Sequence, residues 1–227
     1  MFGDRLATGA DRPPPCDARD ATCEADPRRS GASARTASTL VAAEACRNVG
    51  YLCAELDRTE RIRIQRWKDF EGTLVVHVPL PEIEDSGVAR EMQRAATMGI
   101  RAWNGQPFPI LVDLRGDRNP HFSVQWSASL GGTQIGAART QWSPLTGLTV
   151  ISIELTTRSP YGQGRVSDSR QVRLTAAHEM GHALGLPHSD SDRDIMYPTN
   201  TATSVSAEDR RTMEVLYQME DGTEIVR

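Results

Sequence analysis

The segment from His178 to His188 constrains the fold of this chain more than any other part of its sequence. It reads His-Glu-Met-Gly-His-Ala-Leu-Gly-Leu-Pro-His. Histidines four residues apart on an α-helix project from one face, one turn above the other, and can share a single metal ion. The spacing therefore predicts a helix that carries His178 and His182 and ends early enough for His188 to turn back to the same ion.

The residues around this segment support a helix with defined ends. Asp168, with Gln171 three residues later, is typical of a helix start. Gly185 can adopt the left-handed conformation of a sharp helix exit, and Pro187 discourages the helix from resuming. An apolar stripe recurs at four-residue steps on the side opposite the histidines: Val172, Ala176, Met180 and Leu184.

Three histidines around one ion suggest a catalytic zinc site, because a tetrahedral zinc with three protein ligands leaves its fourth position to water. Glu179 lies beside His178 and is the candidate general base, which takes a proton from that water and passes it to the leaving amine. A histidine pair at helical spacing can also be a mere surface feature. Met196 follows within Asp194–Pro198, where we expect a methionine turn that packs beneath the metal without binding it.

This pattern resembles the metzincin clan of zinc endopeptidases. Ser189 after the third histidine and the run Ile195–Pro198 resemble its matrixin (matrix metalloproteinase-like) group, as do Ser206–Asp209 and Leu216–Tyr217 further on. The resemblance is strong over residues 172–217 and rests upstream on the order of elements. It implies an α+β metzincin catalytic domain: a twisted mixed sheet of about five strands with three helices, and a cleft between an upper and a lower subdomain. It also implies peptide-bond hydrolysis that depends on one zinc ion.

The same resemblance implies where substrate lies. The pocket for the residue after the cut would be walled by Leu174 and by the segment that begins at Pro198. An extended substrate could add to the sheet edge at Gly131–Ala138, which includes Gly136 and Ala137, although an ordinary surface hairpin explains that segment equally well.

Asp113 and Asp117 could serve a calcium ion, but loop carboxylates are more often simply solvated.

The hydrophobic periodicity predicts further elements along the chain. We expect a short helix within 39–57, strands at 73–80, 109–114, 121–126, 136–141 and 148–156, and helices at 86–103 and 206–219. The polar, proline-containing start reads as a flexible leader or pro-segment over residues 1–65, followed by the catalytic domain over 66–227.

Composition and charge indicate which kinds of partner and which cellular compartment suit this chain. The chain of 227 residues has a net charge of −4, which gives no indication of nucleic-acid binding, and no segment is apolar enough to span a membrane. We expect a monomer that acts on proteins or peptides. No signal peptide is visible, yet an enzyme of this type belongs outside the cytoplasm, so we expect a secreted or cell-envelope protein.

Four cysteines precede the predicted catalytic domain: Cys16, Cys23, Cys46 and Cys53. They allow two disulfides in three pairings. If residues 40–56 are helical, Cys46 and Cys53 lie about 10 Å apart and each needs a partner from the earlier pair. One of them could instead cap the zinc as a latency switch. Two other functions remain open: a catalytically silent or latent zinc module that binds a protein partner, and a protease confined to one partner or to self-processing.

Overall fold

Five strands form the main sheet of this computed structural model, which describes residues 39–161 and 165–227. The strands are β3 (Leu74–His77), β4 (Ile110–Asp113), β5 (Phe122–Ser127), β6 (Gly136–Ser143) and β7 (Gly147–Thr156). Their order is β4-β3-β5-β7-β6, with β6 as the antiparallel edge strand and the other pairs parallel. The sheet is thus mixed, and every strand of it was predicted from the sequence to within a few residues.

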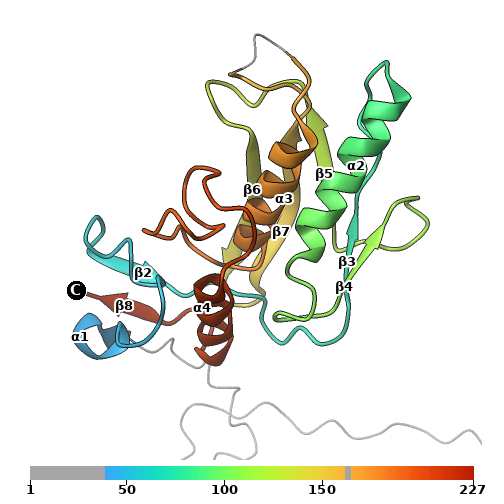
Figure 1. Ribbon diagram of the computed structural model, residues 1–227. Coiled ribbons are helices and arrows are strands. Elements are labelled where there is room, and N and C mark those ends of the chain that lie inside the picture. The colour runs from blue at the N-terminus through green and yellow to red at the C-terminus, as the bar shows by residue number, and fades with distance from the viewer. Residues whose placement is uncertain (1–38, 162–164) are drawn as a thin grey trace, which may run out of the picture. The chain divides into compact units, whose positions relative to one another are not determined.

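Two long helices, α2 (Ser86–Arg101) and α3 (Ser169–Ala183), cover one face of this sheet (Figure 1). They pass close to one another at Gly99, where an added side chain would meet Ala176 and the carbonyl of Arg173. The indole of Trp103 follows α2, is fully buried and donates a hydrogen bond of 2.8 Å to the carbonyl of Ala177. These contacts fix α3 against the core, and α3 carries the predicted metal ligands.

A second sheet, which the sequence did not predict, joins the two ends of the described chain. It has the order β1-β8-β2, where β1 is Thr39–Val41, β2 is Arg61–Arg63 and β8 is Glu224–Val226. Helix α4 (Ala207–Gln218) precedes β8. The compact unit accordingly includes β1, α1 and β2, and Val49 to Leu56 add side chains to the same core. Whether the residues before it are a pro-segment stays a prediction.

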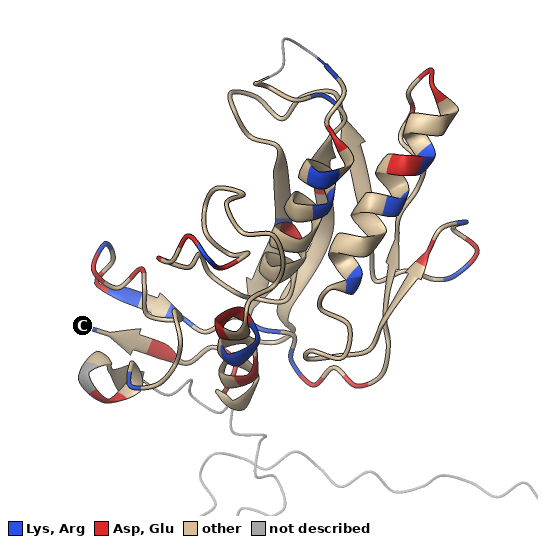
Figure 2. Cartoon of the chain, in the orientation of Figure 1, with Lys and Arg blue, Asp and Glu red and all other residues tan. Residues whose placement is uncertain are grey.

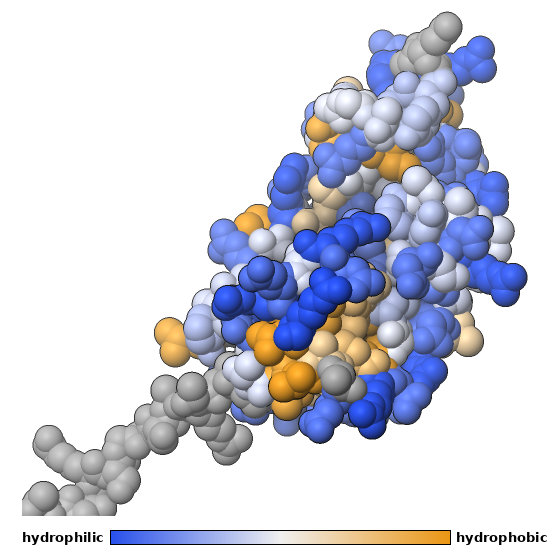
Figure 3. All heavy atoms as spheres, turned by 90° about the vertical axis from the view of Figure 1, so that its left-hand side faces the viewer, coloured by the Kyte–Doolittle hydropathy of each residue, from blue (hydrophilic) through white to orange (hydrophobic). Residues whose placement is uncertain are grey.

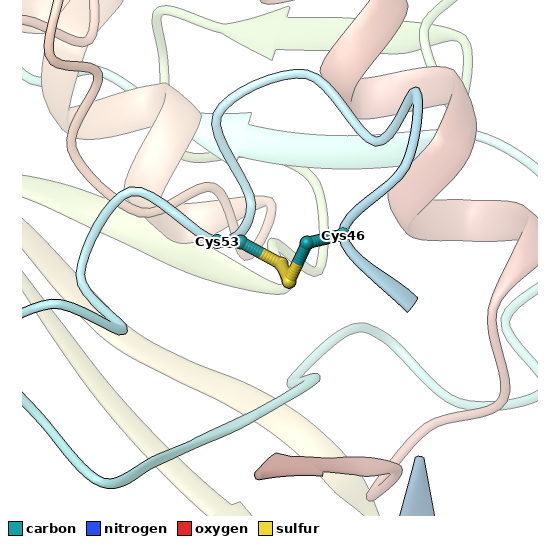
Figure 4. Close-up of a disulfide and its surroundings, with 2 residues drawn as sticks. All are labelled: Cys46 and Cys53. Carbon is teal, nitrogen blue, oxygen red and sulfur yellow. A yellow bond between two sulfur atoms is a disulfide. The ribbon is translucent and has the colours of Figure 1, made fainter. Parts of the chain in front are cut away.

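The short helix that the sequence predicts within 39–57 is present but covers only four residues. Helix α1 covers Ala42–Ala45, and a series of tight turns follows. The turns bring Cys46 and Cys53 within 5.8 Å of one another, Cα to Cα, and the two form a disulfide (Figure 4). The sequence excluded this pairing only for a helix over 40–56, and because the chain does not adopt that helix, the exclusion does not apply. Cys16 and Cys23 lie outside the described residues.

Acidic and basic residues are mixed on the surface of the described part of the chain. Figure 2 shows acidic and basic residues together on α2 and α4, whereas the strands of the main sheet carry few charges. Figure 3, which shows the side where β2, β8 and α1 lie, includes some apolar surface. Exposed apolar residues of the described chain include Leu40 and Val41 of β1. No helix in the described part of the chain is both long and apolar enough to cross a membrane.

Candidate metal centre

Helix α3 begins and ends where the sequence predicted. The side chain of Asp168 accepts a hydrogen bond of 2.7 Å from the amide of Gln171 and caps the helix start. At the other end, the amide of Gly185 bonds the carbonyl of His182 and the amide of Leu186 bonds that of Gly181, which is the Schellman arrangement. Gly185 has φ of 103°, and an added Cβ would run into the carbonyl oxygen of Gln65. Glycine is thus required at this position for two reasons. Its backbone has the left-handed conformation, and a side chain would collide with the backbone of Gln65.

The turn delivers His188 to the two helical histidines, as predicted. The Nε2 atom of His182 lies 3.1 Å from Nε2 of His178 and 3.2 Å from Nε2 of His188. A tetrahedral zinc with bonds of about 2.0–2.1 Å holds its ligand atoms roughly 3.3 Å apart. Among the described residues these three histidines are the only group of His, Cys, Asp or Glu close enough together to share a metal ion.

Backbone carbonyls determine which nitrogen of each helical histidine faces the centre. Nδ1 of His178 lies 2.7 Å from the carbonyl of Ile195, and Nδ1 of His182 lies 2.8 Å from that of Leu186. A carbonyl only accepts, so each Nδ1 carries the proton and each Nε2 of a neutral ring presents a lone pair. Two lone pairs 3.1 Å apart repel one another unless a cation lies between them. The donor set therefore fits a zinc ion.

The electrostatic surroundings keep these rings neutral. Burial lowers the pKa of His178 to about 4 and that of His182 to about 3, since the charged form loses its hydration. The pKa of His188 is also lowered, first by burial, although its side chain is 41% exposed. A metal ligand must be the neutral imidazole, so the site is prepared for an ion at neutral pH.

Glu179 is buried beside the histidines, with 7% of its surface exposed. Burial raises the pKa of its carboxyl group to about 7, and a hydrogen bond from the backbone amide of Ala138 on β6 opposes that rise. The neighbouring Gly136, also on β6, leaves the space that the carboxylate occupies: a Cβ there would lie 2.7 Å from Oε1 of Glu179. The edge strand and the helix together thus hold a carboxylate whose pKa suits proton transfer near neutral pH.

This packing predicts the effect of Gly136→Ala. The new methyl group would displace Glu179 and press on Thr175. If Glu179 is the general base, as the sequence predicts, we expect the rate of peptide hydrolysis to fall by about 10²-fold, typical of a catalytic group moved by about 1 Å. Zinc content should not change, because no metal ligand is touched. The measurement is kcat/KM on a peptide substrate. Gln141→Ala, an exposed position on the same strand, is the control, and an unchanged rate for Gly136→Ala would contradict the assigned contact.

The predicted methionine turn lies beneath the histidines. Met196 is fully buried, and its sulfur packs against Gly181, where a side chain would have no room. A fully buried carboxylate on α4 contributes several of the hydrogen bonds that hold the turn. Asp209 of α4 accepts hydrogen bonds from the amides of Ile195 at 2.9 Å and Met196 at 3.4 Å, and from the hydroxyl of Tyr51 at 2.9 Å. Asp209 also accepts a hydrogen bond of 2.7 Å from the amide of Ser206, as part of a capping box at the start of α4.

The other predicted site residues have different surroundings. Leu174 is 3% exposed and belongs to the hydrophobic core, Ala137 is buried on β6, and Pro198 is exposed after the turn. Asp113 accepts hydrogen bonds from the amides of three loop residues, Arg115, Gly116 and Arg118, and so closes its own loop. Asp117 is exposed. The substrate-pocket and calcium assignments stay predictions.

Sequence reasoning missed the supporting residues of the centre. Nothing in the local pattern around Tyr51 indicates that its hydroxyl bonds Asp209 beneath the histidines. Asp209 did carry a signal, because Ser206 three residues earlier is typical of a helix cap, but its second role at Met196 depends on tertiary contact. The carbonyls of Ile195 and Leu186, which orient the ligands, leave no sequence signature at all.

Known proteins give an independent comparison. The family model described as Matrixin matches residues 81–218, which is more than half of the chain. The macrophage metalloelastase of Rattus norvegicus is 46% identical over 50 residues, which cover 19% of this chain and 10% of that protein. The match therefore spans a small part of that relative's length. The mixed five-stranded sheet and the resemblance inferred from residues 172–217 agree with the family match, and we conclude that the chain belongs to the matrixin family.

Proposed function

We propose that this protein is a zinc-dependent endopeptidase that hydrolyses peptide bonds of protein substrates. The observation that carries the proposal is the convergence of three Nε2 atoms beside the buried carboxylate of Glu179. His178, His182 and His188 would hold the ion. When bound, zinc supplies a Lewis acid that polarises the scissile carbonyl and lowers the pKa of a water molecule.

Glu179 would act as general base in this reaction. Its pKa of about 7 in the metal-free protein means that it can both accept a proton from the attacking water and release it to the leaving amine near neutral pH. The hydrogen bond from the amide of Ala138 holds the carboxylate in place. No covalent link between enzyme and substrate is needed.

Substrate would bind along the edge of the main sheet. Strand β6 has a partner, β7, on one side in the sheet order, so its other side can pair with an extended peptide. Gly136 and Ala137 begin this strand beside Glu179, which would place the peptide next to the catalytic carboxylate. Leu174 and Pro198 remain our candidates for walls of the side-chain pocket.

The compartment is part of the proposal. A disulfide between Cys46 and Cys53 forms and persists in an oxidising environment. This supports export to the cell envelope or the exterior.

Removal and return of metal test the proposed function. We expect about one zinc per chain, cleavage of an unfolded protein such as casein, loss of cleavage on chelation and recovery when zinc is returned. If casein stays intact although the returned zinc fully occupies the site, the result contradicts the proposed endopeptidase activity. It then favours the alternative, a catalytically silent or latent zinc module that binds a protein partner. Repeating the assay on a chain shortened to Ala37–Arg227 distinguishes a latent enzyme from a silent module, because only the former gains activity.

A further inference from the structure

The three metal-binding rings differ in what supports them. His178 and His182 each direct Nδ1 at a backbone carbonyl, whereas Nδ1 of His188 has no such partner within the described part of the chain and faces the carboxylate of Glu55, with Oε1 at 4.0 Å. Metal-binding histidines almost always donate their second ring N–H to a carboxylate, a carbonyl or a water. Glu55 is the group that stands where this partner belongs.

The backbone of Glu55 is held in place by contacts on both sides. Cys53, two residues earlier, is bonded to Cys46, and Tyr51 donates its hydroxyl hydrogen to Asp209. The carbonyl of Glu55 accepts hydrogen bonds from the amides of Arg58 at 2.9 Å and Thr59 at 3.0 Å. The neighbouring leucines, Leu52 and Leu56, are buried in the core. The carboxylate therefore projects from a fixed backbone toward the zinc site.

The same segment also walls the space beside the histidines. A cavity of about 460 Å³ is lined on one side by Leu52, Glu55 and Ile62, and on the other by His182 and Leu186. Leu52, Glu55 and Ile62 thus line the same cavity as His182, although they are far from it in sequence.

We propose that Glu55 is a positioning residue for His188. Its carboxylate accepts the Nδ1 proton, either directly after a side-chain movement of about 1 Å or through one bridging water, and so keeps the Nε2 lone pair directed at the ion. The disulfide-closed turn from Cys46 to Cys53 holds Glu55 within reach. The inference rests on the proposed function, since it requires that these histidines bind zinc.

Zinc affinity tests this role directly, without relying on turnover. The variants are Glu55→Ala and Glu55→Gln, with Asp57→Asn as the matched control, because Asp57 is an exposed carboxylate two residues away in the same segment. Each zinc dissociation constant is measured in the full chain by competition with a chromogenic chelator, and kcat and KM are measured at saturating zinc. Thermal unfolding of the zinc-loaded proteins confirms that each variant folds.

We expect Glu55→Ala to bind zinc about 10-fold more weakly, at the low end of the range for outer-shell partners because the side chain is 44% exposed. Glu55→Gln should be intermediate, since its amide oxygen still accepts the proton but carries no charge, and Asp57→Asn should match wild type. Unchanged zinc affinity in both Glu55 variants would overturn the proposal, and a change in KM alone would assign Glu55 to substrate contact instead. Failure of the wild type to bind zinc would instead refute the proposed function itself.

Discussion

Replacing Glu179 with glutamine is expected to lower kcat/KM by about 10²–10⁴-fold while zinc content stays at the wild-type level. Glutamine has the shape of glutamate but cannot accept the proton of the attacking water. The three histidines and the carbonyls that orient two of them are untouched. The measurement is cleavage of a quenched peptide substrate, with zinc determined on the same preparations by atomic absorption.

The same substitution should stabilise the metal-free protein, and increasingly so as pH rises. Burial raises the pKa of Glu179 to about 7 from 4.5, so between these values the folded state binds more protons than the unfolded state. Stability of the wild type therefore falls as pH rises from about 4.5 to about 7, while Glu179→Gln lacks this dependence. Urea unfolding of both metal-free proteins at pH 5 and pH 8 measures the difference.

Glu91→Gln, on the exposed side of α2, serves as the control for both measurements. It removes the same charge at an exposed position on a different helix, and it should alter neither rate nor pH dependence. If Glu179→Gln retained wild-type activity, Glu179 would not be the base. If it lost activity together with zinc, the loss would be one of metal binding.

Asp209→Ala is expected to destabilise the protein by about 3–5 kcal/mol, the range for removing one partner of a buried, charged hydrogen-bond network. Asp209 is fully buried and accepts hydrogen bonds from four groups that belong to three separate parts of the chain. Without it, the hydroxyl of Tyr51 and the amides of Ile195, Met196 and Ser206 lose their acceptor inside the core. The methionine turn beneath the histidines would loosen, so zinc affinity should fall as well.

Urea unfolding of the zinc-loaded proteins measures this effect, with two variants for comparison. Glu208→Ala removes the adjacent, partly exposed carboxylate and should cost little. Tyr51→Phe removes one of the four donors and should cost about 1.5–3 kcal/mol, as for a hydrogen bond to a charged group. A loss in Asp209→Ala no larger than that in Glu208→Ala would show that the network does not stabilise the turn.

The local pattern of the sequence determined the elements whose structure depends on near neighbours. Helix α3 follows from the four-residue apolar spacing, the cap at Asp168 and the exit at Gly185. The five strands of the main sheet follow from apolar runs between turn residues, and their expected arrangement came from the resemblance to matrixins. The grouping of His178, His182 and His188 could be predicted for the same reason, because the eleven residues from His178 to His188 contain the helix spacing and the turn that bring them together.

Tertiary contact decided what lies between distant parts of the chain. The segment around Cys46 and Cys53 has the composition of a short helix, but buried contacts of Tyr51, Leu52 and Leu56 favour turns, and the turns allow the disulfide. The small sheet pairs β1 and β2 with β8 at the far end of the sequence. Asp209 bonds the methionine turn, and Glu55 lies 4.0 Å from Nδ1 of His188, through contacts between segments that are far apart in sequence. Spacing along the chain specifies helices and strands through local geometry, whereas the supports of the site depend on which surfaces are buried together, and no local pattern records that.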